Sequence, residues 1–349
     1  MTYKYDVGIL GAGAWGTALA QHLAERCGHD VWLWSYEKNT AKEINKKHTN
    51  TGFLPEVNLS ERIKATTSAK DIIKNCKTIL FATPSAHCQE MATVLAPLLS
   101  QDQVLVICAK GFRESDGGLL SDVWMEANPT FKNIAVLSGP TFAHELAQKK
   151  PVTATLAADD DAIIKHVDGL FSSPTLRLYF SNDIISAQVG GALKNTIAIV
   201  AGVSDGLQMG EGFKAALLCR GLVEMMRYSK HLGGQDITLA GLSGMGDLIM
   251  TATPGSRNYR FGSLLGEGKT VAEALEEVNS TIEGISTAGI VTMQGISNGI
   301  DMGVVMAAHG IVSGDLNPKR TFEILLARPR VYEFSKENKM LPQESVSHE

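Results

Sequence analysis

The sequence lacks the patterns of a metalloprotein or of a disulfide-stabilised protein. Its five cysteines, Cys27, Cys76, Cys88, Cys108 and Cys219, form no CxxC pair and fall mostly in apolar segments. None of the nine histidines has HExxH or another metal-ligand spacing. We therefore expect no structural or catalytic metal, and we expect the cysteines to be reduced core thiols of a cytoplasmic protein.

The chain also has no surplus of basic residues and no long hydrophobic run. A net charge of -5 excludes the broad basic surface that nucleic acid or anionic lipid would require, so local cations must hold any anionic ligand. No apolar run reaches the roughly 18 residues of a membrane span, and we expect no stable membrane insertion. Lys4 and the following VGILGAGAWGTALA resemble a signal peptide, but Asp6 and four glycines interrupt the apolar stretch, so we expect no cleaved leader.

What the chain does contain is enough apolar sequence for two domains. Its 349 residues are 44% hydrophobic and 20% charged, as in an ordinary globular protein. Short runs rich in β-branched residues, separated in places by helix-like stretches such as 87–99 and 140–149, favour βαβ units and a largely parallel sheet. These runs begin at residues 5, 30, 78, 103, 133, 151 and 175. We therefore predict an α/β domain with a doubly wound sheet over residues 1–182.

Strand patterns fade after Asn182. Helical patterns follow, for example at 213–232 and 270–278, and predict an all-helical second domain over residues 183–335. We expect the polar residues 336–349 to form a frayed tail. Because clefts often form between domains, we expect a binding site near the junction at residue 183.

A glycine pattern follows the first predicted strand. The segment VGILGAGAWGTALA contains GxGxxG at Gly11, Gly13 and Gly16, just before an alanine-rich helical stretch. The first glycine allows a tight turn, the second lets a pyrophosphate approach the backbone, and the third lets the helix pack against the strand. The helix N-terminus would face the phosphates with free amides and a favourable dipole. The pattern predicts a Rossmann-like domain that binds a dinucleotide.

The residues after the second predicted strand, WLWSYEK, bear on the choice of cofactor. An acidic residue there would bind the ribose hydroxyls and exclude a 2′-phosphate. Ser35 and Tyr36 occupy that position instead, and Glu37 and Lys38 follow with opposite charges. We expect NADP to be accepted and leave NAD open as a second cofactor.

The apolar stretch AQVGGALKNTIAIVAG, residues 187–202, places a lysine in the middle of a helical pattern. On a helix, Lys194 has Gly190, Gly191, Ile197 and Ala198 as its neighbours. A charge on such a face needs a partner or a shifted pKa, unless the side chain extends to the surface and buries only its stem. The residues alone leave both interpretations open.

Several predicted strands end in unusual residues. Lys110 follows a fully apolar strand, and Gly139 and Thr141 follow the strand NIAVLS. In an open parallel sheet, ligands bind outside the carboxyl ends of the strands, so these residues are candidates for the site. The alternative for Lys110 is a lysine that simply ends a strand.

The segment GLSGMGDLIMTATPGSRNYRFG, residues 241–262, is too rich in glycine and polar groups for an ordinary helical hairpin. Ser256, Arg257 and Asn258 form a cluster suited to an anion, since arginine offers a planar fork of donors and asparagine offers two more. Asp247 lies in the same segment, and its alternative role is to cap a helix.

Together these motifs resemble the bacterial-type NAD(P)-dependent glycerol-3-phosphate dehydrogenases, from Gly8 to about Arg330. The motifs that carry the resemblance, in the family's order, are GAGAWGTALA, AKGF, SGPTFAHE, GGALKNTIAI, GMGDLIMTATPGSRNYRFG and IEGISTA. The resemblance implies a Rossmann-like domain, a helical domain and a homodimer. It further implies interconversion of dihydroxyacetone phosphate with sn-glycerol 3-phosphate, in the service of phospholipid synthesis.

The resemblance also assigns roles to individual residues. It implies that Lys194 accepts the proton when the alcohol is oxidised, with Lys110 and Asp247 beside it in the catalytic site. The substrate positions that it implies are Lys110, Gly139, Thr141, Lys194, Asp247, Ser256, Arg257 and Asn258. The cofactor positions, with the three glycines of the GxGxxG pattern, are Gly11, Gly13, Ala14, Trp15, Gly16, Tyr36, Lys110, Ala143, Arg257, Thr281 and Glu283.

The proposed proton role requires a change in the pKa of Lys194. A free lysine is a poor base at neutral pH, because its pKa is about 10.4. Apolar neighbours and a nearby Lys110 would lower the pKa of Lys194, whereas Asp247 would raise it. The sequence does not decide which influence is larger.

Two other functions share this pattern. A β-hydroxyacid dehydrogenase or a relative of 6-phosphogluconate dehydrogenase resembles this architecture and also places a lysine on the inter-domain helix, although the SRN cluster and the KGF motif argue against it. A dinucleotide sensor without turnover would share the fold, but it would have no need for Lys194 and Lys110 beside the cofactor.

Overall fold

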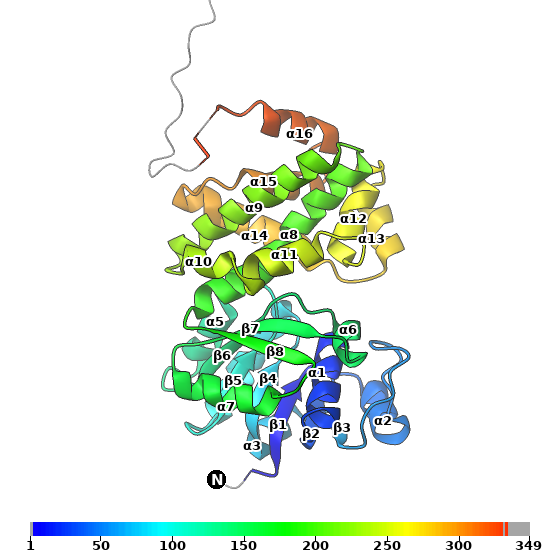
Figure 1. Ribbon diagram of the computed structural model, residues 1–349, viewed down its shortest axis with the longest axis vertical. Coiled ribbons are helices and arrows are strands. Elements are labelled where there is room, and N and C mark those ends of the chain that lie inside the picture. The colour runs from blue at the N-terminus through cyan, green and yellow to red at the C-terminus, as the bar shows by residue number, and fades with distance from the viewer. Residues whose placement is uncertain (1–2, 331, 334–349) are drawn as a thin grey trace, which may run out of the picture.

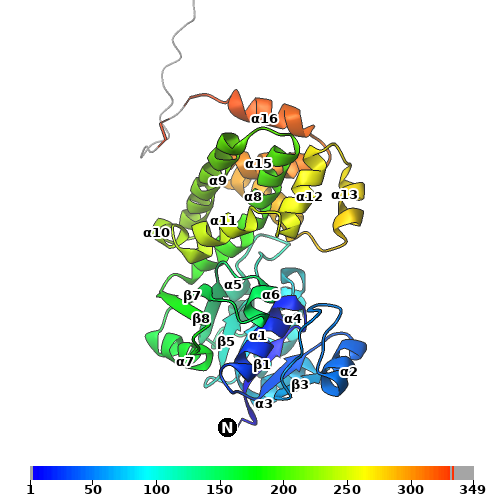
Figure 2. The same cartoon turned by 45° about the vertical axis from the view of Figure 1, so that its right-hand side comes forward.

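The computed structural model describes residues 3–330, 332 and 333, and places a sheet with its helices below a layer made only of helices (Figures 1 and 2). The last strand ends at Ser181, and the first long helix of the second layer begins at Ile184. The predicted fold class, a Rossmann-like domain followed by an all-helical one, is confirmed. The predicted tail over residues 336–349 lies outside the described residues.

One eight-stranded sheet forms the N-terminal domain. The strands are β1 (Tyr5–Leu10), β2 (Val31–Trp34), β3 (Ile63–Thr66), β4 (Cys76–Phe81), β5 (Val104–Ile107), β6 (Ile134–Ser138), β7 (Val152–Ala158) and β8 (Leu176–Ser181). Their order is β3-β2-β1-β4-β5-β6-β7-β8, and every neighbouring pair is parallel except β6 with β7. The strand order therefore reverses between β1 and β4, which is where open α/β sheets bind their ligands.

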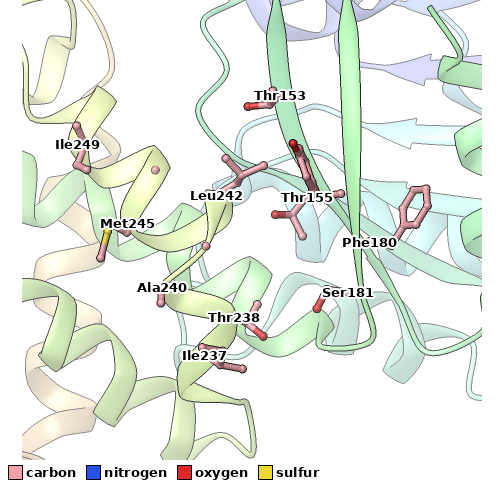
Figure 3. A pocket seen from close by; sticks show the side chains of 13 residues that line it. Thr153, Thr155, Phe180, Ser181, Ile237, Thr238, Ala240, Leu242, Met245 and Ile249 are labelled. Carbon is pink, nitrogen blue, oxygen red and sulfur yellow. The ribbon is translucent and has the colours of Figure 1, made fainter.

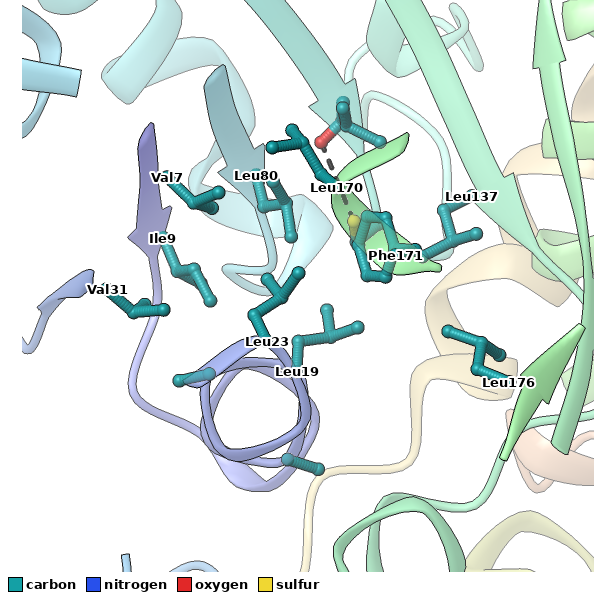
Figure 4. Close-up of a cluster of buried hydrophobic side chains, with 14 of the residues drawn as sticks. Val7, Ile9, Leu19, Leu23, Val31, Leu80, Leu137, Leu170, Phe171 and Leu176 are labelled. Atoms are coloured by element: carbon teal, nitrogen blue, oxygen red, sulfur yellow. Dashed lines mark hydrogen bonds between the residues drawn. The ribbon is translucent and has the colours of Figure 1, made fainter. Parts of the chain in front are cut away.

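Helices cover both faces of this sheet. They are α1 (Ala14–Glu25), α2 (Lys38–Lys47), α3 (Ala69–Asn75), α4 (Cys88–Leu95), α5 (Leu120–Ala127), α6 (Ala143–Ala147) and α7 (Asp161–Phe171), with short 3₁₀ turns η1 (Ser85–His87) and η2 (Ala96–Leu98). On one face Val7 and Ile9 of β1 pack with Leu19 and Leu23 of α1 (Figure 4). Leu10, the next residue of β1, packs on the other face, because successive strand residues point to opposite sides.

The seven apolar runs noted in the sequence all form strands, but β3 was not predicted. Of its four residues only Ile63 is buried, so this edge strand leaves no apolar run. The helix-like stretch at 140–149 was also too long. Helix α6 spans only Ala143–Ala147, since a turn through Pro140 precedes it and Lys149 has a φ of 63°, which ends it.

The second layer consists of helices in the residues that the structure describes. They are α8 (Ile184–Gly206), α9 (Glu211–His231), α10 (Asp236–Leu239), the π-helical turn η3 (Leu242–Gly246), α11 (Asp247–Thr251), α12 (Arg257–Gly266), α13 (Val271–Val278), α14 (Glu283–Asn298), α15 (Gly303–Val312) and α16 (Pro318–Leu326). The 23-residue helix α8 runs through the middle of this layer, and α9, α11, α12, α14 and α15 pack around it.

Glycines allow the closest of these contacts. A Cβ at Gly202 would lie 2.1 Å from the Tyr259 carbonyl oxygen, and one at Gly262 would lie 2.0 Å from the Ile199 carbonyl oxygen. Because side chains at these positions would collide with backbone, α8 and α12 touch directly. The glycines at these two positions therefore reflect helix packing.

One helix in the described part of the chain could span a membrane by length and composition, although Gln188, Lys194 and Asn195 interrupt its apolar residues. Helix α8 is long and apolar enough by length and composition, with a mean hydropathy of 1.3 over an 18-residue window. However, 94% of that window is buried inside the fold, as expected for the core helix of a helical domain.

The cysteine prediction was right for most of the thiols. Cys76, Cys88 and Cys108 are buried, Cys27 is partly buried, and all five are free. Cys219 is exposed on α9, which contradicts its assignment to the core. The neighbouring Ala215 and Ala216 are exposed as well, whereas Leu217 and Leu222 are buried.

Candidate active site

A cavity with a volume of about 770 Å³ lies between the two layers, at the carboxyl ends of β1 and β4. The glycine turn after β1 lines it, as do Thr83 and Pro84 after β4. Residues from α8, α12 and the segment before α14 close it from the other side. The cavity thus lies at the point where the strand order reverses, between the two domains.

The glycine turn has the geometry that the sequence pattern requires. Gly11 has a φ of +124°, and a Cβ at Gly16 would lie 1.9 Å from the Gly11 carbonyl oxygen. Nothing lies within 4 Å of a Cβ at Gly13, so this side of the turn is open to the cavity. Helix α1 starts at Ala14 without a side-chain cap, which leaves its first amides available to a phosphate. These residues fit the pyrophosphate of a dinucleotide.

Lys194 is buried and paired. Its side chain is 6% exposed, and its Nζ donates to Asp247 Oδ1. The interpretation of a lysine that extends to the surface is therefore wrong. Asp247 is fully buried and also accepts from Lys110, whose Nζ lies 2.7 Å from Asp247 Oδ2 and 2.9 Å from the Gly139 carbonyl oxygen. One carboxylate thus holds two lysines, and both lysines line the cavity.

A close backbone approach brings Asp247 to Lys194. A Cβ at Gly190 of α8 would lie 2.2 Å from the Ser243 carbonyl oxygen, so only glycine lets the turn η3 rest on α8 at this level. The turn leads directly into α11, whose first residue is Asp247. Asp247 therefore begins a helix, close to the predicted alternative, but its side chain binds the two lysines and Thr251 Oγ1 rather than the helix backbone.

Burial lowers the pKa of Lys194 from its ordinary value to about 7. Removal of the ammonium from water is the largest influence, the charge of Asp247 raises the pKa, and the charge of Lys110 lowers it. The competition that the sequence left open is thus decided by desolvation. A lysine with a pKa near neutrality can both donate and accept a proton at physiological pH.

A second cluster of polar side chains lies at the start of α12. Arg257 is exposed to the cleft, and its Nη1 donates to Ser280 Oγ at 3.2 Å. Asn258 is buried, and its Nδ2 donates to Asn195 Oδ1 at 3.1 Å while its Oδ1 accepts from the Gly284 amide. Burial raises the pKa of the Glu283 carboxyl, and Arg257 opposes this rise.

The structure gathers most of the predicted site residues around this one cavity. Those that line it are Gly11, Gly13, Ala14, Trp15, Lys110, Thr141, Ala143, Lys194, Ser256, Arg257, Asn258, Thr281 and Glu283. Gly16, Gly139 and Asp247 lie behind this lining and support it. Tyr36 does not line the cavity; it is 81% exposed at the end of β2.

Several residues of the cavity were not predicted from the sequence. Asn195 lies next to Lys194 and joins Asn258 to Glu283 Oε2, and an adjacent lysine and asparagine in an apolar helix were its signal. Arg260 lies one helical turn after Arg257 and adds a second arginine to the lining. Phe53, from the loop after α2, gave no signal because no recognisable motif surrounds it.

A second cavity, of about 620 Å³, lies between the edge of the sheet and the helical layer (Figure 3). Thr153, Thr155 and Phe180 line it from β7 and β8, and Ile237 and Leu242 line it from the helices. None of its lining residues is charged. Its chemistry therefore does not suit a phosphorylated ligand, and the first cavity is the candidate site.

The sheet with its glycine turn, the helical layer and the buried lysine between them define a dinucleotide-dependent oxidoreductase of the two-domain type. Comparison with known proteins makes the assignment specific. Residues 6–164 match the model of the N-terminus of NAD-dependent glycerol-3-phosphate dehydrogenase, and residues 183–323 match that of its C-terminus. The chain belongs to this family, and the predicted family, enzyme class and use of NAD or NADP are confirmed.

Relatives and solved structures agree over nearly the whole chain. Glycerol-3-phosphate dehydrogenase [NAD(P)+] from Erythrobacter litoralis is 42% identical over 93% of this chain and 96% of the relative. The enzyme of that name from Rhodospirillum rubrum is 40% identical, with 96% of each chain covered. The crystal structure of glycerol-3-phosphate dehydrogenase from Coxiella burnetii has a TM-score of 0.88 and 36% identity, over 93% of this chain and 99% of that one.

Solved structures of other dehydrogenases are similar to this chain in fold alone. A D-mandelate dehydrogenase structure has a TM-score of 0.59 with 14% sequence identity, over 91% of this chain and 99% of that chain. This likeness shows that the architecture alone does not identify the substrate. The match of both domains to one dehydrogenase family also removes the ground for a sensor without turnover.

Proposed function

We propose that the protein interconverts dihydroxyacetone phosphate and sn-glycerol 3-phosphate with NADP or NAD, and that Lys194 is the general acid and base. The observation that carries this proposal is the position of Lys194, which shares one cavity with the glycine turn and has a pKa lowered to about 7. The buried lysine and the dinucleotide-binding turn thus face the same space. Such convergence is what a reaction between a bound dinucleotide and a small substrate needs.

Residues of the cavity would hold the dinucleotide. Gly11, Gly13 and the first amides of α1 would bind the pyrophosphate, and Trp15, whose indole nitrogen is buried without a partner, faces the same space. When bound, the nicotinamide supplies or accepts the hydride. Ala143, Thr281 and Glu283 also line this cavity, and we assign them to the cofactor. Tyr36, exposed just after β2, would bind the ribose of the cofactor.

The opposite side of the cavity is suited to the substrate phosphate. Arg257 and Arg260 lie exposed on the first turn of α12 and bring two positive charges into the lining. Asn258 and Ser256 lie beside Arg257, and arginine with asparagine can donate several hydrogen bonds to one phosphate group. A protein with a net charge of -5 can therefore bind a dianion, because its cations are concentrated here.

Lys194 is placed to exchange a proton with the substrate oxygen. As an ammonium it would donate the proton during reduction of the ketone, and as a neutral amine it would accept the proton during oxidation of the alcohol. Asp247 holds the amine in position, and Lys110 on the other carboxylate oxygen lowers the pKa of Lys194 and adds positive charge where an alkoxide would develop. Thr141 and Gly139 lie beside Lys110 and complete this side of the substrate site.

A steady-state assay tests this function directly. Purified protein is mixed with dihydroxyacetone phosphate and either NADPH or NADH, and the loss of nicotinamide absorbance is recorded. Turnover with dihydroxyacetone phosphate, and none with a 2-keto or 3-keto carboxylic acid of the same size, is the expected result, since the cavity offers a phosphate cluster at Arg257. Turnover only with the carboxylic acid would overturn the proposal. The comparison of the two cofactors decides between NADP and NAD.

Arg257→Ala is expected to weaken substrate binding. Loss of a charged hydrogen bond to phosphate costs about 1.5–3 kcal/mol, which corresponds to a rise in KM for dihydroxyacetone phosphate of about 10-fold to 100-fold. kcat is expected to fall less, and the KM for cofactor to change less. Arg220→Ala on α9, which does not line the cavity, is the matched control. Equal KM values for dihydroxyacetone phosphate in both variants would remove Arg257 from the phosphate site.

The sequence pattern supports the domain boundaries, the cysteines support the location, and the resemblance to the family supports the assembly and the metabolic role. We propose domain boundaries at residues 1–182 and 183–335, a homodimer, a cytoplasmic location and a contribution to phospholipid synthesis. Sedimentation equilibrium of the purified protein measures the assembly, and a mass of twice 37.4 kDa is expected. A single 37.4 kDa species at micromolar concentration would contradict the homodimer.

A further inference from the structure

The loop between β5 and α5 belongs to the sheet domain in sequence but joins the core of the helical domain. Phe112 is 1% exposed and Leu119 is 4% exposed. Both lie in the hydrophobic cluster formed by α8, α9, α14 and α15, together with residues such as Leu193 and Tyr228. The sheet domain thus extends an apolar anchor into its neighbour, close to the catalytic cavity.

Two contacts fix the anchor in the helical domain. The rings of Phe112 and Tyr228 pack edge to face, with their centroids 5.6 Å apart and their planes at 72°. On the far side of the loop, Gln294 Nε2 of α14 donates to the Asp116 carbonyl oxygen at 2.6 Å. Arg113 closes the loop on itself, because its Nε and Nη2 each lie 2.7 Å from a carboxylate oxygen of Asp116.

The anchor lies two residues after Lys110. Between them, Gly111 passes so close to η1 that a Cβ there would lie 2.2 Å from Ser85 Oγ, so this backbone packs directly against η1. Lys110 is therefore held on one side by the end of β5 and on the other by Phe112. Its Nζ reaches Asp247 on α11, which is part of the same helical domain as the partners of Phe112.

We propose that Phe112 is a positioning residue of the reaction: its insertion between α8 and α9 fixes Lys110 against Asp247 and so keeps Lys110 beside Lys194. The proposal rests on the proposed roles of the two lysines. Phe112 itself does not line the cavity and touches neither substrate nor cofactor there. It acts by making the Lys110 segment move with the helical domain that carries Lys194.

The proposal predicts a specific change in pH dependence. The charged groups that face Lys194 are Asp247 from α11, Lys110 from the β5–α5 loop and Glu283 from α14. Without the anchor, Lys110 moves away, and its lowering influence on the pKa of Lys194 is lost while Asp247 becomes free to pair with Lys194 alone. Any water that enters the space left by the Phe112 ring also reduces the desolvation of Lys194. All three changes raise the pKa of Lys194.

The experiment compares Phe112→Ala with Phe322→Ala. Phe322 on α16 is also fully buried and also packs edge to face, with Phe213, at a centroid distance of 5.2 Å and an angle of 73°. Phe322 lies far from Lys110 in the sequence and in a different hydrophobic cluster from Phe112. Each variant therefore loses a buried phenylalanine ring that packs in the helical layer. The readouts are kcat/KM for oxidation of sn-glycerol 3-phosphate as a function of pH, and the thermal unfolding midpoint.

In the wild-type protein kcat/KM is expected to fall below about pH 7, where Lys194 becomes protonated. For Phe112→Ala we expect this fall to move to higher pH by about one unit, and kcat/KM at its plateau to decrease by about 10-fold to 100-fold, because a misplacement of about 1 Å can cost about 100-fold. Phe322→Ala is expected to keep the wild-type pH profile, with a plateau within about 3-fold, while its unfolding midpoint drops as much as that of Phe112→Ala. Lys110→Met serves as a reference that should move the profile in the same direction.

The outcomes distinguish the positioning role of Phe112 from the proton role of Lys194. An unchanged pH profile in Phe112→Ala beside a shifted one in Lys110→Met would overturn the positioning role and leave the lysines in place. A wild-type profile with no fall near neutrality would instead overturn the role of Lys194. If the alanine variants do not fold, the pair Phe112→Leu and Phe322→Leu replaces them, since the position of the fall does not depend on the amount of folded enzyme.

Discussion

Replacement of Lys194 by alanine is expected to lower kcat for reduction of dihydroxyacetone phosphate by about 100-fold to 10,000-fold, the range that a general acid contributes. The side chain is buried beside the dinucleotide-binding turn, and its pKa of about 7 suits proton exchange in both directions. Cofactor affinity is expected to stay nearly unchanged, because the glycine turn packs against Ala82 and Thr83 after β4 and not against α8. Steady-state kinetics and titration of protein fluorescence with NADPH measure the two quantities.

Lys214→Ala is the matched control for this variant. Lys214 lies on α9 in the same domain and also pairs with an aspartate, Asp205, at 2.8 Å, but it does not line the cavity. Its kcat should remain within about 2-fold of the wild-type value, because neither member of this ion pair lines the cavity. Wild-type turnover in Lys194→Ala would remove the proton role from this residue. Loss of NADPH binding in the same variant would show a folding defect instead.

Much of the fold could be predicted because its signals are local. The strands buried on both faces appear as continuous apolar runs, and β3 escaped detection because only Ile63 of that strand is buried. Helix α8 was predicted from its apolar stretch, and the glycine turn from its spacing. Gly190 and Gly202 could be seen as glycines in a helix, but the neighbours that require them, η3 and α12, come 40 or more residues later in the chain.

The residues of the site could be predicted from the sequence, but the contacts between them could not. A charge among apolar neighbours drew attention to Lys194, yet its pairing with Asp247 bridges 53 residues and depends on the contact of η3 with α8. Sequence reasoning therefore could not decide the direction of the pKa shift. The same limit applies to Asn195, whose partners Asn258 and Glu283 lie on two other helices.

Asp247 emerges from the structure as the centre of the site's electrostatics. It is fully buried, and its two carboxylate oxygens each accept from one lysine. Lys110 comes from the sheet domain and Lys194 from the helical domain. The carboxylate of Asp247 therefore connects the two domains at the reaction centre. Removing one partner of a buried ion pair typically costs about 3–5 kcal/mol, because a buried charge loses its compensation.

Asp247→Asn is accordingly expected to have the second large effect. The substitution keeps the shape but removes the negative charge between Lys110 and Lys194. Because that charge raises the pKa of Lys194 and the charge of Lys110 lowers it, the pKa of Lys194 should fall below its value of about 7. The amine is then neutral at pH 7 and cannot donate a proton, so kcat for reduction of dihydroxyacetone phosphate at pH 7 should drop by about 100-fold or more.

The direction of the pH shift distinguishes this effect from simple loss of structure. Reduction needs the protonated amine, so the remaining activity of Asp247→Asn should increase as the pH is lowered from 7 toward 5.5, whereas wild-type kcat should change little over that range. Asp205→Asn is the matched control, since Asp205 on α8 also pairs with a lysine and accepts from Tyr259, and it should keep the wild-type profile. If Asp247→Asn instead required higher pH than the wild type for reduction, Asp247 would not support the protonated state of Lys194. The electrostatic part of the mechanism would then be wrong, because a buried carboxylate in contact with an ammonium can only favour its charged form.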